Sequence, residues 1–262
     1  MNFLKRAIKY CVRQRLRTLL LFLTFTLLST TVLIAVSSEE AVLQGTKQIE
    51  ETVGASVRME IDMNNQNNFG PAEDFGNGAS GYTYNGDRIT EKIISAISKL
   101  PNVVSYNAKI DGGYWGIPEN FEPIPGMVNA PGLSIPYTAV LDSSLDIKFL
   151  NGTYKLEEGR HINPDDSCTV LISKELADKN NLSVGDKITF QEFETGKTES
   201  TFTIVGIYSG TEGTTKQAIT PDGIPANSGY IDMDGLKKFY EKKKKKLEGY
   251  DNLDIYTHSP EE

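Results

Sequence analysis

The sequence predicts an α+β domain attached to a membrane by one N-terminal helix, and two observations lead to this prediction. Residues 18–38 carry no charge, and 21 helical residues at about 1.5 Å each cross a hydrocarbon layer of about 30 Å. Beyond them, stretches with the two-residue period of strands alternate irregularly with helical stretches, and we find no internal repeat. We therefore divide the chain into a basic segment 1–17, a transmembrane helix 18–38, a stalk helix 39–54 and an extracytoplasmic domain 55–262.

Charge predicts the direction in which this helix crosses the membrane. Basic residues stay on the cytoplasmic side, and only acidic residues, Glu39 and Glu40, directly follow the uncharged stretch. We therefore expect a cell-membrane protein with its N-terminus in the cytoplasm and the residues after about 39 outside. The alternative is a signal peptide cleaved near residues 35–37, but the basic region and the apolar stretch both exceed the usual lengths. The orienting residues are Lys5, Arg6, Lys9, Arg13, Arg15 and Arg17.

The segments that flank the uncharged stretch also have helical spacing. In 1–17, apolar and basic residues occupy opposite sides of a helix, which is typical of an amphipathic helix on an anionic inner leaflet. Inside the uncharged stretch, Thr and Ser hydroxyls can bond to carbonyls of their own helix, so they do not interrupt it. Residues 39–52 contain no Pro and one Gly, which predicts a stalk that ends near Gly54.

The composition of residues 39–262 excludes several classes of function. This part contains 21 Lys and Arg against 35 Asp and Glu, and such an acidic surface argues against a nucleic-acid partner. Cys11 and Cys168 lie on opposite sides of the predicted helix, so no disulfide is expected. His161 and His258 are the two histidines, which leaves little material for a catalytic triad or a zinc site. We interpret His161 as a surface residue.

No motif predicts a metal, a cofactor or catalysis. One set of residues has the spacing of calcium-loop ligands, but it lacks the Gly at the sixth position and has no flanking helices. Its members are Asp62, Asn64, Gln66, Asn68 and Glu73. No P-loop is present, so ATP hydrolysis would belong to another chain. We expect no enzymatic activity, no cofactor and no metal. No set of catalytic residues supports the alternative of an anchored hydrolase.

Periodicity predicts the elements of the outer domain. Apolar alternation or short apolar runs predict strands at 57–63, 102–110, 137–141, 168–172, 187–190, 202–208, 228–232 and 253–256. Helical spacing predicts helices at 89–100, 173–180 and 234–247. Pro101 stops the first of these helices, and Ser173 is the expected cap of the second.

Two stretches are predicted to lack regular structure. Residues 64–87 are rich in Asn and Gly, which predicts a surface loop, and 111–136 are interrupted by Pro and Gly, which predicts a long ordered loop. In the second loop, Tyr114 and Trp115 form either a recognition surface or part of the core. The run Lys242 to Lys246 is either a solvated helix face or a contact for anionic lipids or cell-wall polymers.

Three segments, read together, resemble the permease subunits of MacB/FtsX-type ABC transporters. They are Arg13 to Leu20, Leu156 to Ile162 leading into Cys168 to Ala177, and Leu182 to Phe190 followed by Phe202 to Ile207. Their order and spacing carry the resemblance more than any one of them. It implies an extracytoplasmic domain of the MacB periplasmic core type, with two α+β lobes and a stalk that transmits movements driven by a separate ATPase.

The residues that stand out within these segments have structural roles. Gly159 and Gly185 suit turns with positive φ, and Asp186 can accept amide hydrogens of its turn. Gly206 allows a close approach of two backbones. With Arg160 of the Gly-Arg turn, these are the structural-turn residues that the sequence predicts.

The resemblance also implies partners. These are a cytoplasmic ABC ATPase subunit, a second permease copy or companion permease in a dimer, and the lipid bilayer. In that family three transmembrane helices follow the outer domain, so we expect the N-terminal part of a longer permease, with a natural one-helix subunit as the alternative. The expected function is a permease component that couples substrate binding or gating to the ATPase, in export or mechanotransmission. The rival function is a stand-alone, membrane-anchored binding or sensor protein.

Overall fold

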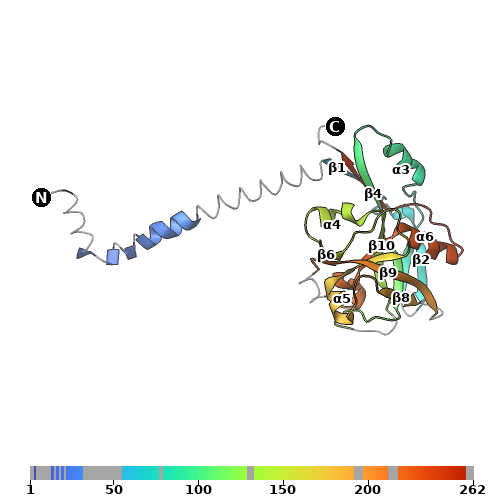
Figure 1. Cartoon of the computed structure of the whole chain (residues 1–262). Helices are drawn as coiled ribbons and strands as arrows, with labels where there is room; N and C mark the ends of the chain where they lie inside the picture. The colour runs from blue at the N-terminus through green and yellow to red at the C-terminus, as the bar shows by residue number, and fades with distance from the viewer. Residues whose placement is uncertain are drawn as a thin grey trace. The chain divides into compact units, whose positions relative to one another are not determined.

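Figure 1 shows a computed structural model of the chain. The residues that it describes are 3, 13, 14, 16, 17, 19, 20, 22–31, 55–76, 79–128, 133–191, 197–211 and 218–257. Contacts divide the chain into two units, Met1–Thr52 and Val53–Glu262. The predicted stalk helix, 39–54, lies outside the described residues.

In the first unit, residues 22–31 are helical, within the stretch predicted to cross the membrane. The hydroxyls of Thr30 and Thr31 donate to the carbonyl of Leu27 over 2.9 and 2.8 Å. These bonds confirm that hydroxyl groups of this stretch return to their own helix. Among the residues described, no helix is at once long and apolar enough to span a bilayer.

Nine strands of the second unit form one sheet within the part of the chain that the structure describes (Figure 1). In spatial order they are β1 (Ala55–Glu60), β11 (Asn252–Thr257), β4 (Val103–Pro118), β5 (Ile135–Val140), β10 (Gly229–Asp232), β7 (Thr169–Ser173), β9 (Thr198–Ser209) and β6 (Lys155–Gly159). The ninth strand, β8 (Lys187–Gln191), pairs with both β4 and β9. Parallel and antiparallel pairs occur together, and helices pack around the sheet, so the predicted α+β class is confirmed.

The double pairing of β8 closes part of this sheet into a ring. The order around the ring is β4, β5, β10, β7, β9 and β8, and β8 returns to β4 through the pairs Ile117 with Gln191 and Pro118 with Phe190. A closed ring leaves its strands without an unpaired edge and encloses a space that side chains must fill.

Aromatic side chains fill the interior of the ring. Tyr114, Tyr137, Phe190 and Phe202 are all buried. The ring of Tyr114 meets Phe190 and Phe202 edge to face, with centroids 5.3 and 5.4 Å apart, a geometry that favours aromatic pairs. Helix α6 (Met233–Lys242) covers this cluster, with Phe239 4.9 Å from Tyr114. Tyr114 is therefore part of the core.

All three predicted helices are present, the one capped by Ser173 with its expected bounds and the other two shorter than expected. They are α3 (Glu91–Ile97), α5 (Lys174–Asn180) and α6. Ser173 caps α5 as predicted, because its Oγ accepts the amide hydrogen of Leu176 over 3.1 Å. Helix α6 ends at Lys242, so most of the lysine run lies beyond the helix and not on its face. A further short helix, α4 (Ile147–Leu150), was not predicted.

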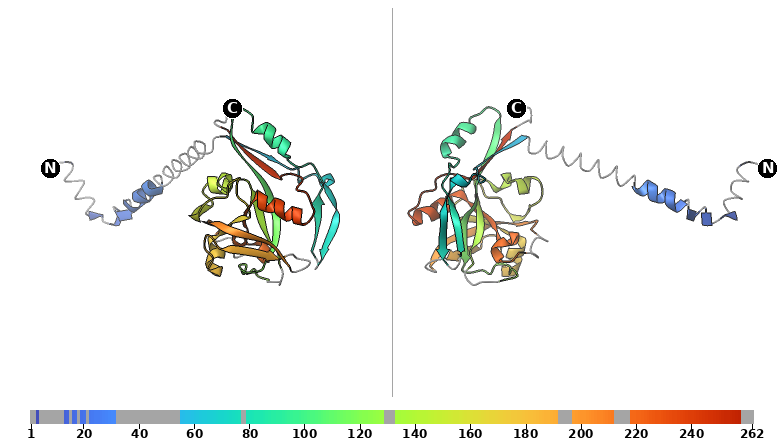
Figure 2. Two further views of the ribbon diagram at one scale, coloured as in Figure 1. Left: turned by 45° about the vertical axis from the view of Figure 1, so that its right-hand side comes forward. Right: turned by 180° about the vertical axis from the view of Figure 1, so that it is seen from behind.

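The prediction of a surface loop at 64–87 was wrong. A 3-10 turn, Gln66–Asn68, leads into the hairpin of β2 (Phe69–Gly76) and β3 (Ala79–Tyr84), a separate sheet whose paired strands Figure 2 shows in cyan. Phe69 and Tyr84 meet edge to face at 5.6 Å. Backbone pairing holds these strands, and their Gly- and Asn-rich composition gives little of the apolar alternation that reveals a half-buried strand.

The prediction for 111–136 was wrong over its first eight residues. Strand β4 continues through this stretch to Pro118 instead of ending at Ile110. Gly112 has φ +58°, and the pairing with β5 shifts register between Ile110 and Tyr114, which is the geometry of a β-bulge. Gly112 and Gly113 therefore bend the strand without ending it. Trp115 lies on the continued strand and is 49% exposed.

One other expectation needs correction. The alternation at 57–63 is typical of a half-buried strand, but Val57 and Met59 of β1 are 57% and 38% exposed, and β1 is an edge strand whose described partner is β11 alone. Contacts hold Val53–Glu262 together as one compact unit, and the division into two lobes stays an expectation. Strand β4 explains this continuity, since its first half pairs with β11 and its second half with β5 and β8.

Candidate functional site

Three of the residues with calcium-loop spacing, Asp62, Asn64 and Asn68, bond to one another. Asp62 Oδ1 accepts the amide hydrogen of Asn64 over 3.1 Å, and Asn68 Nδ2 donates to the carbonyl of Asp62 over 2.9 Å. Across the described residues, no group of three or more His, Cys, Asp or Glu side chains is arranged to hold a metal. Charged side chains gather instead in two other places, a buried cluster beside β11 and a groove beside α6.

The buried cluster is centred on Lys109 of β4. Its Nζ lies 3.0 Å from Asp146 Oδ2 and 2.9 Å from Asp254 Oδ2, and all three side chains are buried. Arg58 of β1 completes the cluster, with its Nε 2.6 Å from Asp254 Oδ1 and its side chain 43% exposed. These four residues, the Lys109 cluster, connect strands β1, β11 and β4 with the start of α4.

The charges of the Lys109 cluster balance, two positive against two negative. Burial opposes the charge on Lys109, but the neighbouring Asp146 and Asp254 carboxylates outweigh it and hold the pKa of Lys109 above its ordinary value. The hydrogen bond to Asp254 likewise raises the pKa of Arg58. Asp146 also caps α4, since its Oδ1 accepts the Lys148 amide hydrogen over 3.0 Å. Removing one of the three buried members, Lys109, Asp146 or Asp254, leaves a buried charge without full compensation, which costs more than such a pair contributes.

Strands β1 and β11 bring two distant parts of the chain to one edge of the sheet. They run antiparallel, with Ala55 opposite Thr257 and Glu60 opposite Asn252. The residues before 55 and those after 257 therefore connect to the domain at the same place. Strand β11 pairs in turn with β4, which continues into the ring, so backbone hydrogen bonds and the Lys109 cluster connect β1 to the ring.

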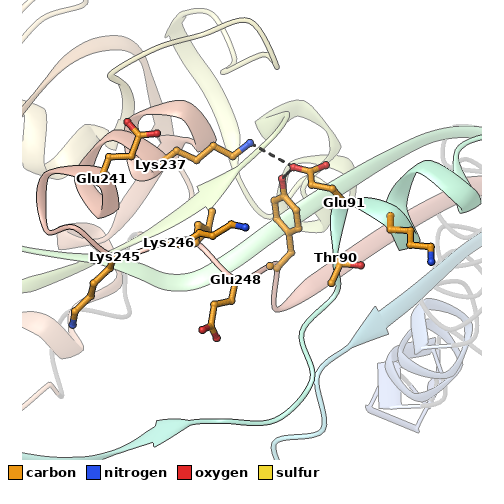
Figure 3. Close-up of a pocket in the computed structure, with 11 residues that line it drawn as sticks. Thr90, Glu91, Lys237, Glu241, Lys245, Lys246 and Glu248 are labelled. Atoms are coloured by element: carbon orange, nitrogen blue, oxygen red, sulfur yellow. Dashed lines mark hydrogen bonds and ion pairs between the residues drawn. The ribbon is translucent and has the colours of Figure 1, made fainter.

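The second place is a groove of about 630 Å³ between α3, α6 and the segment that follows α6. Figure 3 shows Lys237 reaching from α6 toward Glu91 of α3, where their charged atoms are 3.5 Å apart. Tyr250 also donates its hydroxyl hydrogen to Glu91. Lys245 and Lys246 line the groove on the side of the segment after α6.

The structure brings the predicted turn residues together around one short stretch of β9. Gly159 pairs with Gly206 in the β6–β9 ladder and has φ +76°. The amides of Arg160 and Gly185, the latter at φ +99°, donate to the carbonyls of residues 205 and 204, each over 2.8 Å. Asp186 Oδ2 accepts a turn amide hydrogen over 2.8 Å, and a Cβ on Gly206 would lie 2.5 Å from a backbone oxygen.

Arg160 also has a role that the sequence did not predict. Its guanidinium binds both carboxylate oxygens of Asp166, over 2.6 and 2.7 Å. This bidentate geometry is the strong form of the Arg–carboxylate pair, and it closes the turn that follows β6.

The expectation that His161 is a surface residue was wrong. The side chain is half-buried, with Nδ1 3.0 Å from Ser143 Oγ and its ring 4.8 Å from that of Phe149. Burial lowers the pKa of His161 below its ordinary value, and the negative charge of Asp142 opposes this shift. His258 lies outside the described residues.

The orientation residues lie mostly outside the described part of the chain, with Arg13 and Arg17 inside it. Arg17 Nη1 donates to Gln14 Oε1 over 3.3 Å. Nothing in this geometry bears on which side of a membrane these residues lie, so the orientation stays a prediction.

Sequence reasoning missed the Lys109 cluster. A signal was present, because Lys109 stands between Ala108 and Ile110, and a charge inside an apolar strand is either exposed on one face or paired. Its partners were not readable from local sequence, since Asp146 follows 37 residues later and Asp254 comes from the last strand.

The sequence is 27% identical over 245 residues to an uncharacterised ABC transporter permease, YclI, from Bacillus subtilis strain 168. The resemblance to ABC transporter permeases is confirmed. The alignment covers 83% of this chain, and the chain spans about half, 49%, of the permease YclI. No protein-family model matches the chain.

Two solved extracytoplasmic domains resemble this permease-like chain in part. The periplasmic region of MacB from Actinobacillus actinomycetemcomitans has a TM-score of 0.48 at 10% identity, over 84% of this chain and 81% of that one. The extracellular domain of the ABC-type transporter YknZ from Gram-positive bacteria has a TM-score of 0.43 at 17% identity, over 66% of this chain and 75% of that one.

Proposed function

We propose that this chain is a permease component of an ABC transporter, whose outer domain couples substrate binding or gating to a cytoplasmic ATPase. The observation that carries the proposal is the 27% identity over 245 residues to the permease YclI. In this proposal residues 18–38 cross the cell membrane and 55–257 lie outside it. The chain has no catalytic role of its own, and ATP hydrolysis belongs to the partner ATPase.

The pairing of β1 with β11 supports a mechanical form of this coupling. Strand β1 directly follows the predicted stalk, so a pull or rotation of the stalk acts first on Ala55. The β1–β11–β4 ladder and the Lys109 cluster resist separation of these strands and carry the displacement to the ring. A rigid path of this kind suits an export or mechanotransmission mechanism.

The proposed partners are the cytoplasmic ATPase, a second permease copy or companion permease, and the bilayer. The first test is association in the membrane. The protein, expressed from its own gene in its native membrane, is purified in mild detergent and the stoichiometry of the accompanying P-loop ATPase is measured. We expect a defined complex, and ATP hydrolysis by the ATPase should rise when the chain is added in vesicles. A chain that purifies alone and leaves hydrolysis unchanged contradicts the proposal and favours the anchored binding or sensor protein.

A variant of the Lys109 cluster tests the coupling path separately. Arg58→Gln removes the bond from β1 to Asp254 while the buried Lys109 keeps both carboxylates. We expect this variant to retain the complex and to lose most of the stimulation of ATP hydrolysis. Lys174→Gln is the matched control, because Lys174 makes a surface ion pair with Asp178 far from this path. Equal stimulation by both variants contradicts coupling through β1.

A further inference from the structure

One short stretch of the outer domain is strongly basic. Residues 237–248 contain seven Lys and two Glu, whereas the rest of 39–262 contains 14 Lys and Arg against 33 Asp and Glu. A positive stretch on an acidic domain is locally attractive to anions, although the net charge of the domain repels them. The acidic residues already keep the domain soluble. Solubility therefore does not explain this basic stretch.

The backbone holds this stretch in a defined conformation. After α6 ends, the amides of Lys244 and Lys245 donate to the carbonyls of Glu241 and Tyr240, each over 2.9 Å. Lys244 has φ +55°, in the left-handed region that usually holds Gly or Asn at the end of a helix. A lysine here is less favourable to the fold than a glycine.

The lysines at the end of this stretch are available to a ligand. Lys237 and Lys238 have carboxylate partners in Glu91 and Asp234. Lys244, Lys245 and Lys246 are exposed, and no ion pair joins them to a carboxylate anywhere in the described ranges. The dipole of α6 does not account for them either, because its effect fades within the last turn and these residues lie beyond Lys242.

We propose that Lys244, Lys245 and Lys246 bind a linear polyanion with repeated phosphate groups outside the membrane. Lysine ammonium groups bind phosphate as point charges, so a row of them suits a flexible chain of phosphates without requiring one fixed geometry. Lys245 and Lys246 also line the groove beside them, where Glu91, Glu241 and Glu248 lie as well (Figure 3), so the binding surface that we propose is the exposed row of the three lysines.

The position of the lysines along the chain favours a polymer over the bilayer. They precede β11, which carries the chain about 20 Å over six residues to the edge where Thr257 pairs with Ala55. The chain enters the domain at that edge, through Ala55. The lysines therefore lie at the other end of β11 from the residue through which the chain enters the domain.

Binding is tested with the full chain in nanodiscs of phosphatidylcholine and with fluorescent inorganic polyphosphate as the probe. The triple variant K244Q/K245Q/K246Q should bind about tenfold or more weakly, and its salt dependence should be shallower by about two to three in log–log slope. The variant K244R/K245R/K246R keeps the charge and should retain binding. The matched control K155Q/K174Q/K187Q removes three exposed lysines elsewhere and should bind like the unaltered chain.

A single substitution separates binding from stability. Lys244→Gly relieves the left-handed conformation, so it should raise the Tm of the outer domain while it weakens polyphosphate binding. A purely structural role for this lysine predicts the first effect without the second. Equal binding by the triple variant and its control overturns the proposal, whether both bind well or both poorly.

A further experiment measures binding of the chain to separate vesicles that contain phosphatidylglycerol. If the triple variant loses binding to these vesicles and keeps its affinity for polyphosphate, the lysines serve the bilayer and the proposal is wrong. The assays need no ATPase, so their outcome is independent of the proposed transport function.

Discussion

Lys109 on β4 and Asp254 on β11 face each other in the interior, with Nζ and Oδ2 2.9 Å apart. This contact lies on the same pair of strands that joins the edge of the sheet to the ring, and Asp146 and Arg58 complete it. Its members are separated widely in sequence, so it forms only when β1, β4 and β11 have assembled. The cluster therefore reports on the assembly of the domain as a whole.

We predict that Lys109→Met destabilises the outer domain by about 3–5 kcal/mol, because it leaves two buried carboxylates with one half-exposed arginine between them. The free energy of unfolding is measurable by urea titration of the full chain in detergent. Trp115 is the one tryptophan of the chain, so its fluorescence follows the outer domain alone.

The matched control is Lys155→Met, at a lysine whose side chain is 76% exposed and whose ion pair with Glu157 spans 3.6 Å. A surface pair of this kind contributes little to stability, so the control should unfold close to the unaltered chain. If Lys109→Met lowers the free energy of unfolding no more than this control does, the Lys109 cluster does not stabilise the domain as its burial indicates.

We predict that the outer domain loses stability as the pH falls below about 6.5, the ordinary pKa of histidine, and that His161 causes part of this loss. Burial lowers the pKa of His161 in the folded chain, so the unfolded chain takes up the proton first. The stabilisation is complete above about pH 6.5 and is lost as the pH falls through the lower folded pKa. The Tm of His161→Asn should therefore fall less between about pH 7.5 and about pH 5.

His258→Asn serves as the comparison for this measurement, since it removes the other histidine of the chain. Its Tm should keep the full dependence on pH. The same slope in His161→Asn and in the unaltered chain would show that protonation of His161 is not linked to unfolding.

The predicted membrane topology has a direct labelling test. In a chain with Cys11 and Cys168 replaced by serine, Lys174→Cys should react with a membrane-impermeant maleimide on intact cells, because its side chain is 48% exposed on the outer domain. Arg13→Cys should react only after the cells are made permeable. Reaction of Arg13→Cys on intact cells, or protection of Lys174→Cys, contradicts the orientation.

The parts of the fold that local sequence predicted are those whose signal is local. The buried strand β7 and the capped helix α5 follow from one apolar run and from Ser173, and both are present as expected. The hairpin of β2 and β3 has no such signal, because its strands are held by pairing and their composition resembles that of a loop.

The bulge at Gly112 shows a second limit of local reasoning. Two consecutive glycines indicate the end of a strand, but a single residue at positive φ lets β4 bend and continue to Pro118. Closure of the ring depends on β8 pairing with both β4 and β9, and the Lys109 cluster on side chains from four elements. Such non-local partners have no signature in a single sequence.

Alanine variants of the turn glycines around β9 allow the cost of backbone strain to be measured apart from the cost of overpacking. Gly185 has φ +99° with open space where a Cβ would lie, so Gly185→Ala should cost about 1–2 kcal/mol from its backbone alone. Gly206 is outside the positive-φ set, but its Cβ would lie 2.5 Å from the Arg160 carbonyl oxygen, so Gly206→Ala should cost about 1–3 kcal/mol from overpacking. Gly159 combines φ +76° with a Cβ only 2.2 Å from the Val205 oxygen, so its alanine variant should be the least stable of the three.

Gly152→Ala calibrates this series, because Gly152 has φ +74° and, like Gly185, nothing within 4 Å of its Cβ position. These two variants should have similar free energies of unfolding in the urea titration followed by Trp115. If Gly159→Ala is no less stable than Gly152→Ala, strands β6 and β9 can shift enough to accommodate a methyl group. In that case the close approach of Gly159 and Gly206 would not be what fixes the position of the Gly-Arg turn, and the Arg160–Asp166 bridge would remain as the contact that holds it.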